Sequence, residues 1–247
     1  MAHDTVQNSM RINTKDILVR QSLFAKASES LLENFVQAAT VKTLRKGEAL
    51  FLQGEDADAF YIVLSGWIKL FRETLDGHEA VIDMLTNGHI FGESATLEDG
   101  IYSFGAEAIE DVRVLRLPSA ILKKAITDDN GMALAMLTSL SRHRKQQTRE
   151  IESLTLQNAS QRIGCFLLRL CHRDDPGPIE LKLPYDKSLI AARLGMKSET
   201  FSRALNKLRD ETGISVKGAT VVIPTLQTMS RFSCSACSNE FPCDDMH

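Results

Sequence analysis

Three cysteines near the carboxyl end of this 247-residue chain, Cys234, Cys237 and Cys243, follow the spacing C-x2-C-x5-C. Two thiols at C-x2-C spacing can chelate one metal centre, and a third thiol nearby supplies another ligand. Thiolates select iron–sulfur clusters or zinc. A Cys3His zinc site that includes His247 and a reversible disulfide between Cys234 and Cys237 are alternatives, as is a disordered tail with incidental thiols. The pattern therefore predicts metal or redox chemistry without choosing between them.

The other two cysteines, Cys165 and Cys171, lie six residues apart in an apolar segment. On a helix they would face in different directions, and we expect both in the protein core rather than at a metal. The chain begins with a polar stretch that has no signal-peptide core, so a framework of disulfides is not expected.

A second group of residues, Glu199, Ser202 and Arg203, has the spacing of side chains on one helical face. Arg203 can donate two hydrogen bonds to guanine, Glu199 can accept one from cytosine, and Ser202 suits several bases. These three residues are predicted to read base edges in a major groove. A surface ion pair between Glu199 and Arg203 is the alternative.

Polar and basic residues around this group are predicted to contact DNA beside the base readers. Ser198 is expected to be exposed at the start of the helix. Phosphate contacts, which give affinity rather than sequence choice, are expected from Thr200, Lys197, Lys207 and Lys217.

The elements around these residues form a recognisable pattern. A helix over 186–194, a turn at Gly195 and a helix over 198–211 are followed by strands at 214–216 and 220–223. A further strand at 179–183 precedes them. Together they predict a winged helix-turn-helix, whose small core is expected from Ile190, Leu194, Phe201, Leu205 and Leu208.

The first half of the chain has a different hydrophobic pattern. Helical spacing over about 15–40 gives way to short apolar runs at 49–52, 59–64, 67–71, 80–85 and 112–117, which are separated by glycines. Asp76-Gly77 is a hairpin turn signal. Short strands at regular spacing predict an antiparallel barrel or jelly roll.

Between these regions, residues 130–156 predict one long helix with a narrow apolar seam, followed by a second helix over 159–172. The seam alternates four and three apart and has two polar interruptions: Ala133, Leu137, Leu140, Arg144, Gln147, Ile151 and Leu154. Such a seam favours a parallel homodimer. Packing on its own domain is the alternative.

Charge is distributed unevenly along the chain, although the formal net charge is only −3. Residues 48–111 hold 14 acidic and 2 basic residues, and residues 182–217 hold 8 basic and 4 acidic residues. This asymmetry predicts an acidic module joined to one that approaches phosphate.

No apolar run of 18 residues occurs, so we expect a cytoplasmic protein without a membrane partner. We find no nucleophile motif, P-loop or dinucleotide fingerprint, and we expect no enzyme activity, an enzyme with an added DNA-binding domain being the alternative class.

The chain resembles the CRP/FNR family of bacterial regulators from about residue 18 to residue 223. The matching residues are Phe91-Gly92-Glu93, the glycines between the strands, Asn158-Ala-Ser-Gln-Arg162 and the segment Glu199-Thr-Phe-Ser202-Arg203. The resemblance implies an α+β fold with a cupin-like β-roll (jelly roll) sensor domain, a long dimerisation helix and a winged helix-turn-helix. The expected ranges are 1–127, 128–157 and 158–226, with a cysteine-containing tail over 227–247.

The recognition segment resembles the FNR branch of the family rather than the CRP branch. This implies palindromic sites with TTGAT-like half-sites, which two-fold symmetry sets one helical turn apart. In FNR-like proteins the acidic hairpin, here Asp76 to Glu79, touches RNA polymerase. The sequence is compatible with activation of transcription and with repression.

The resemblance also bears on the effector. Relatives that bind cAMP follow Phe-Gly-Glu with an Arg-Ser pair that holds the phosphate, whereas no arginine stands between Phe91 and Asp111 here. We therefore expect no cAMP binding. Haem, which other members bind for CO or NO, is an alternative with His78 or His89 as candidate ligand.

FNR proteins that sense oxygen carry the same cysteine spacing near the amino terminus and take a fourth cysteine from the β-roll. Some relatives instead have the cysteines at the carboxyl end and a carboxylate as fourth ligand. The resemblance thus implies a redox-sensing [4Fe–4S] cluster on Cys234, Cys237 and Cys243 with a fourth ligand that is not cysteine. Candidates are Glu150, Glu152, His143 and Asp244. A regulator controlled by zinc or thiols, or not controlled at all, remains an alternative.

Overall fold

The computed structural model describes residues 13–73, 76, 79–172, 177–184, 187–237 and 241–243. Several positions invoked above lie outside the described residues: Gly77, His78, Asp186, Asp244 and His247. The chain forms two compact units, residues 1–72 with 85–142 and residues 73–84 with 143–247.

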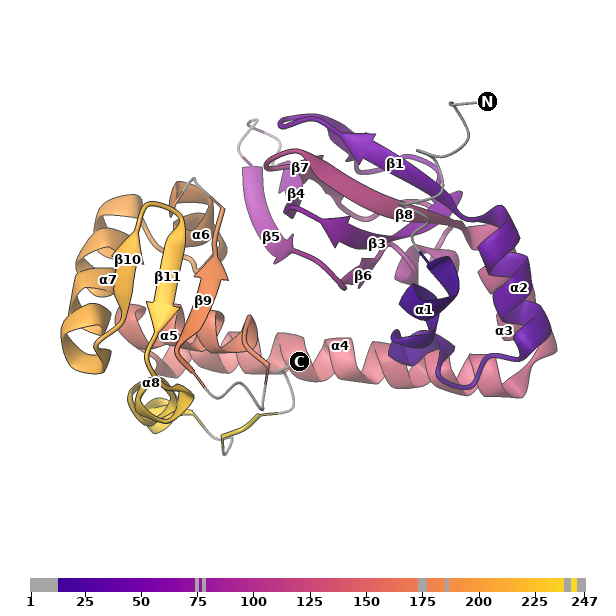
Figure 1. Cartoon of the computed structure of the whole chain (residues 1–247). Coiled ribbons are helices and arrows are strands. Elements are labelled where there is room, and N and C mark those ends of the chain that lie inside the picture. The colour runs from indigo at the N-terminus through magenta and orange to yellow at the C-terminus, as the bar shows by residue number, and fades with distance from the viewer. Residues whose placement is uncertain are drawn as a thin grey trace, which may run out of the picture. The chain divides into compact units, whose positions relative to one another are not determined.

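Antiparallel strands form a β-roll, which belongs to the first unit except for residues 73–84 at the end of one sheet (Figure 1). One sheet has the order β1-β8-β3-β6 and the other the order β2-β7-β4-β5. The strands are β1 (Thr40–Leu44), β2 (Ala49–Phe51), β3 (Ala59–Ser65), β4 (Ile68–Glu73), β5 (Glu79–Leu85), β6 (Ile90–Phe91), β7 (Gly105–Ala108) and β8 (Val112–Pro118).

Two apolar cores use opposite faces of the first sheet. Along β3, Tyr61 and Val63 face the interior of the roll, while Phe60 and Ile62 face the helices. This alternation follows from the period of two in a strand. On the helical side, Phe60 meets Phe24 and Phe35, with ring centroids 6.4 and 5.9 Å away. The roll therefore has a filled interior and a helix-covered outer face.

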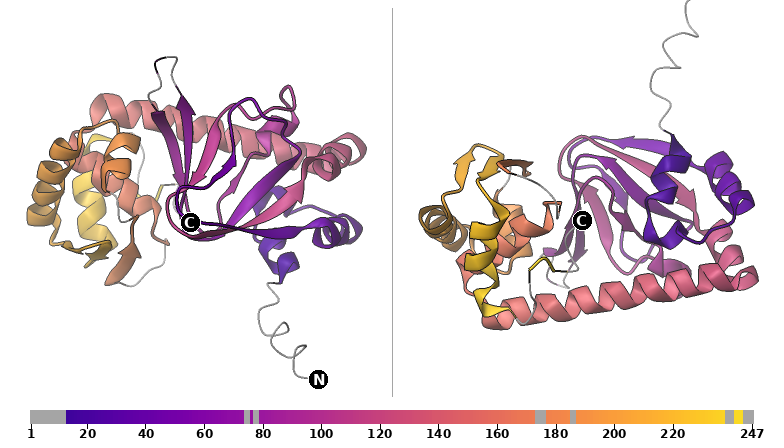
Figure 2. Two further views of the ribbon diagram at one scale, coloured as in Figure 1. Left: turned by 90° about the horizontal axis from the view of Figure 1, so that it is seen from above. Right: turned by 60° about the horizontal axis from the view of Figure 1, so that its bottom comes forward.

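Short helices and the first half of a long helix supply that cover. They are α1 (Thr14–Val19), the 3-10 turn η1 (Ser22–Phe24), α2 (Glu29–Ala38), α3 (Ser119–Asp128) and α4 (Asn130–Leu156). Met132 and Met136 of α4 are buried in the same core as Phe60. Both views of Figure 2 show α4 as one continuous helix.

The second unit holds the second half of α4 and four further helices around a small sheet of order β10-β11-β9. The helices are α5 (Ala159–Arg169), α6 (Lys187–Arg193), α7 (Ser198–Thr212) and α8 (Leu226–Ser233), and the strands are β9 (Ile179–Lys182), β10 (Ser215–Lys217) and β11 (Thr220–Ile223). Helix α5 packs against both α7 and α8, which makes it the central helix of this unit.

The predicted α+β fold, with its β-roll, long helix and winged helix-turn-helix, is confirmed. Two details differ. The amino-terminal helical region is broken into α1, η1 and α2. The segment expected as a tail begins with helix α8, which Thr225 caps by accepting a hydrogen bond from the Thr228 amide at 3.3 Å. None of the helices in the described ranges is long and apolar enough to cross a bilayer.

Candidate functional site

The helix-turn-helix is made by α6 and α7 with a tight connection between them. Gly195 in this connection has a φ of +62°, which a residue with a side chain rarely adopts. Ile190, Leu194 and Phe201 are buried between the helices. Leu208 is buried as well, and Leu205 is only half-buried. This small core fixes the direction in which α7 presents its outer face.

That outer face carries the residues predicted to read DNA. Glu199, Ser202 and Arg203 are exposed in the first two turns of α7, on the side opposite buried Phe201 and Ala204. The Ser202 hydroxyl donates to the Ser198 carbonyl at 3.0 Å, so its oxygen keeps acceptor capacity for a base. The structure thus brings the three side chains together on one accessible helical face.

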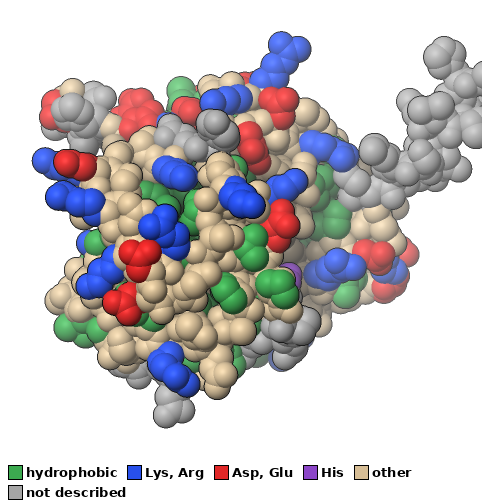
Figure 3. All heavy atoms as spheres, turned by 60° about the vertical axis from the view of Figure 1, so that its left-hand side comes forward, with side chains coloured by type: hydrophobic (Ala, Val, Ile, Leu, Met, Phe, Trp, Pro, Cys, Tyr) green, Lys and Arg blue, Asp and Glu red, His purple; other side chains and the backbone are tan. Residues whose placement is uncertain are grey.

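The predicted phosphate-binding residues border this face. Lys197 is the N-cap residue of α7 and Lys217 ends β10 at the tip of the wing hairpin, and both side chains are exposed, as are Ser198 and Lys207. Thr200 is half-buried. Figure 3 shows Lys and Arg side chains spread over this side of the chain with Asp and Glu side chains among them. The positive charge is therefore distributed around the helix rather than concentrated in one patch.

The interior of the β-roll is filled by aromatic rings. Phe51 stacks on Tyr102 with ring centroids 3.6 Å apart and an interplanar angle of 12°, and Tyr61 and Phe91 pack beside them. The Tyr102 hydroxyl donates to the Ala59 carbonyl at 2.6 Å. Burial raises the pKa of Tyr102 well above its usual range, so this ring stays neutral. Aromatic packing thus occupies the roll next to Phe91-Gly92-Glu93.

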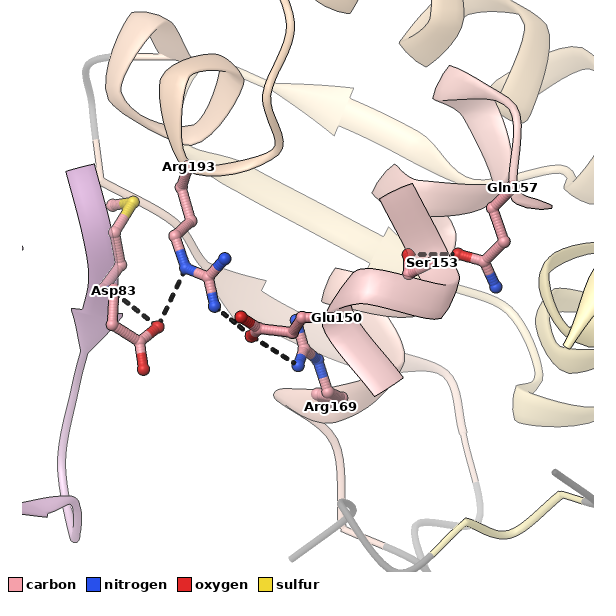
Figure 4. A network of polar contacts seen from close by, with 7 residues as sticks. Asp83, Glu150, Ser153, Gln157, Arg169 and Arg193 are labelled. Carbon is pink, nitrogen blue, oxygen red and sulfur yellow. Dashed lines mark hydrogen bonds and ion pairs between the residues drawn. The ribbon is translucent and has the colours of Figure 1, made fainter. Parts of the chain in front are cut away.

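A chain of ion pairs joins helices of the second unit (Figure 4). Arg193, at the end of α6, contacts Asp83 at 3.0 Å and also pairs with Glu150 of α4. Arg169 of α5 contacts Glu150 at 3.3 Å. Burial by itself lowers the pKa of Arg193, but the carboxylates of Asp83 and Glu150 outweigh burial and raise it. Arg193 is therefore a fixed cation that ties α6 to α4.

The carboxy-terminal cysteines lie beside α5. Cys234 begins the 3-10 turn η3 (Cys234–Ala236) directly after α8, and Cys237 and Cys243 line a cavity of about 50 Å³. Cys165 of α5 lines the same cavity. Burial, together with the nearby thiols of Cys165, Cys243 and Cys237, raises the pKa of Cys234 to about 12. Four thiols are thus gathered in one place.

This arrangement corrects one sequence-based expectation. Cys171 is a core residue, being buried and donating its thiol hydrogen to the Leu167 carbonyl at 3.3 Å. Cys165 is only half-buried and faces the cavity instead. The reason is helical geometry, since six residues turn the two side chains to different sides of the segment.

In the ranges that the structure describes, no three or more His, Cys, Asp or Glu side chains lie close enough to hold a single metal ion. Thiolates around one zinc ion would lie roughly 4 Å apart, because Zn–S bonds are about 2.3 Å long. The described cysteines therefore do not form a site for a single zinc ion.

The predicted candidates for a fourth ligand and for a haem ligand lie in different parts of the structure. Glu150 and Glu152 both line the cavity, but Glu150 is bound by Arg193 and Arg169. His143 is not part of the cavity wall that the structure describes. His89, a candidate haem ligand, has its Nδ1 atom 2.9 Å from the Thr86 carbonyl. The His89 ring is therefore held by a hydrogen bond within its own turn.

Comparisons with known proteins define the class. Residues 41–129 match the family model of the cyclic nucleotide-binding domain, and residues 161–232 match that of the Crp-like helix-turn-helix domain. The chain belongs to the CRP/FNR family of transcription regulators, and it is a DNA-binding regulator rather than an enzyme.

Three relatives illustrate the range of this family. The cyclic AMP receptor protein of Thermus thermophilus is 31% identical over 72% of this chain and 81% of its own length. The nitrogen fixation regulation protein FixK of Rhizobium meliloti is 30% identical over 74% and 81%. A solved structure of a candidate cyclic nucleotide binding protein from Ruegeria pomeroyi is 35% identical, covers 90% of this chain and 97% of its own, and has a TM-score of 0.70.

We expect Arg193→Leu to destabilise the protein by about 2 kcal/mol, because it leaves Glu150 and Asp83 partly buried without their shared cation. The matched control is Arg209→Leu, since Arg209 is an exposed arginine beside Asp210 and should cost less than about 0.5 kcal/mol. Urea unfolding of the full chain measures both. Equal losses for the two variants would contradict a structural role for the Arg193 ion pairs.

Proposed function

We propose that this protein is an FNR-type regulator that binds palindromic TTGAT-like sites as a homodimer and responds to redox state through a [4Fe–4S] cluster. Cys234, Cys237 and Cys243 would hold the cluster. The observation that carries the proposal is the accessible row of Glu199, Ser202 and Arg203 on α7, combined with a separate group of thiols beside α5.

Sequence choice is assigned to the exposed face of α7. A recognition helix enters the major groove with its amino-terminal residues toward the bases. Arg203 would bind guanine, Glu199 cytosine, and Ser202 a neighbouring base. Ser198, Thr200, Lys197 and Lys217 would contact the backbone and hold the helix in register.

The dimer is assigned to the seam of α4. Leu137, Ile151 and Leu154 are 61, 67 and 54% exposed in the single chain, although they are large apolar side chains. Met132 and Met136 are buried against the first unit instead, so the seam is a second apolar face of the helix. Pairing two such seams would remove these side chains from water.

The effector is assigned to the cysteines rather than to the β-roll. The roll has the fold of a cyclic nucleotide-binding domain, but aromatic rings pack its interior and no arginine follows Glu93 before Asp111. A cyclic phosphodiester would lack the arginine that is its main charged partner in relatives that bind cAMP. When bound, an iron–sulfur cluster supplies reversible electron transfer and sensitivity to oxygen.

Contact with RNA polymerase is assigned to the acidic hairpin that includes Asp76 and Glu79. A cytoplasmic location follows from the DNA partner. The sign of regulation then depends on where the operator lies relative to the promoter.

Arg203→Ala should weaken binding to a duplex with two TTGAT-like half-sites by roughly 10- to 100-fold, which corresponds to about 1–3 kcal/mol. Binding to a scrambled duplex should change little. Fluorescence anisotropy at fixed salt measures both affinities. Lys217→Ala is the control, because loss of a phosphate contact should weaken both duplexes alike. Unchanged discrimination in Arg203→Ala would contradict the assignment of Arg203 to a base.

Ile151→Glu should convert the dimer to a monomer, because it places a charge in the apolar seam of each partner. Sedimentation equilibrium measures the mass, and operator affinity should fall with it. Val41→Glu introduces the same charge at an exposed valine of β1 and should leave the dimer intact. A monomeric wild-type protein, or a dimeric Ile151→Glu variant, would argue against the seam.

Protein purified without oxygen should contain iron and acid-labile sulfide and show visible absorbance that bleaches in air. Elemental analysis and absorbance spectra measure this directly. Cys234→Ser should abolish the absorbance. A colourless, zinc-free wild-type protein that still binds its operator would refute control by a metal.

A further inference from the structure

Helix α5 approaches α8 very closely, and a glycine allows this approach. A Cβ atom on Gly164 would lie only 1.9 Å from the Ser233 hydroxyl and 3.3 Å from the Met229 sulfur. Any side chain at this position would therefore push the two helices apart. Cys165 directly follows Gly164, and Cys234 directly follows Ser233. The contact between the helices thus brings these two cysteines close together, although they are far apart in sequence.

Hydrogen bonds hold the segment after α8 to the start of α5. Gln161 accepts from the Asn158 amide at 3.0 Å as part of the capping box of α5, and its Nε2 donates to the Ser235 hydroxyl at 2.9 Å. Gln157 is buried and donates to the Ser233 carbonyl at 3.3 Å. Residues on both sides of Cys234 are therefore held by the residues that precede and begin α5.

The cavity between these elements has the charge that a thiolate group requires. Four arginines and two glutamates line it together with Cys165, Cys237 and Cys243. The Nε atom of Arg162 is buried and has no hydrogen-bond partner among the described residues, which is costly for a charged donor. Since Arg162 lines the cavity, a thiolate or a sulfide placed there would accept its hydrogen bond.

We propose that Cys165 is the fourth thiol of the carboxy-terminal group, so that Cys165, Cys234, Cys237 and Cys243 of one subunit bind the cluster. This assignment rests on the proposed function, and it replaces a carboxylate by a thiolate as the fourth ligand. Glu150, one of the two glutamates that line the cavity, is instead paired with Arg193 and Arg169.

The assignment gives the metal a structural consequence inside one subunit. Cys165 belongs to α5, which packs against the recognition helix α7 as well as against α8. A group bound to Cys165 and to the three later cysteines would fasten the end of the chain to the helix that supports α7. Because metal binding adds to folding free energy, this region should be more stable with metal than without it.

The test compares Cys165→Ser with Cys171→Ser in the full chain, purified and reconstituted with iron and sulfide without oxygen. Cys171 is the matched control because it is a buried cysteine of the same segment that does not line the cavity. Iron and sulfide per subunit, the electron paramagnetic resonance spectrum and the rate of iron loss to a chelator are measured. We expect Cys165→Ser to lose iron faster by on the order of 10-fold or more, since even an outer partner of a ligand can cost that much. Cys171→Ser should match the wild type.

A second measurement uses the wild-type chain and so does not depend on how a variant folds. Iodoacetamide labelling followed by peptide mass spectrometry reports the reactivity of each cysteine with and without metal. Metal should protect Cys165 together with Cys234, Cys237 and Cys243. Circular dichroism of the metal-free variants shows whether Cys165→Ser keeps the wild-type fold.

The outcomes separate this inference from the function on which it rests. If Cys165→Ser keeps its iron and its spectrum while Cys234→Ser loses both, and metal leaves Cys165 labelling unchanged, the inference is overturned and the cluster stands. If the protein holds zinc instead and Cys165 is protected, the four-thiol site is supported and the iron–sulfur assignment fails. If neither metal binds, both are overturned.

Discussion

The second unit depends on the close contact of α5 with α8 at Gly164. With no side chain at that position, the backbone of α5 lies against Ser233, which is fully buried. The contact positions the end of the chain on one side of α5, while α7 packs on another. A single helix thus connects the segment that carries the cysteines to the segment that carries the proposed DNA-reading residues.

The elements with strong local signals could be predicted from the sequence. Helix α7 is predicted because its apolar residues recur at helical spacing after the turn at Gly195. Helix α4 was predicted at the bounds observed, because its seam repeats over many turns. Strand β7 was not predicted, since its residues Gly105 to Ala108 are mostly small and form a strand only through pairing with β2 and β4. Local pattern was therefore sufficient where an element is long and periodic, and insufficient where neighbours impose the conformation.

The same distinction applies to the candidate site. Glu199, Ser202 and Arg203 are neighbours on one helix, so their common face follows from spacing alone. The position of Cys165 depends on tertiary packing between α5 and α8, and no periodicity within either segment reveals it. Gly164 was the one available signal, because a glycine inside an apolar helix often marks a close approach of backbones. The sequence predicts the burial of Cys171, whereas the exposure of Cys165 to the cavity follows only from the packed structure.

In the proposed dimer, the polar residues within the seam of α4 have a consequence for the choice of partner. Arg144 and Gln147 are exposed and interrupt a face that is otherwise apolar, with Leu137 on one side and Ile151 on the other. In paired helices a polar residue at a core position weakens the association but penalises any alignment that sets it against an apolar residue. Two identical chains in register meet each other's polar residues at the same level. A foreign chain with an uninterrupted apolar seam would bury a guanidinium without a polar counterpart, so mixed dimers would be selected against by the helix itself.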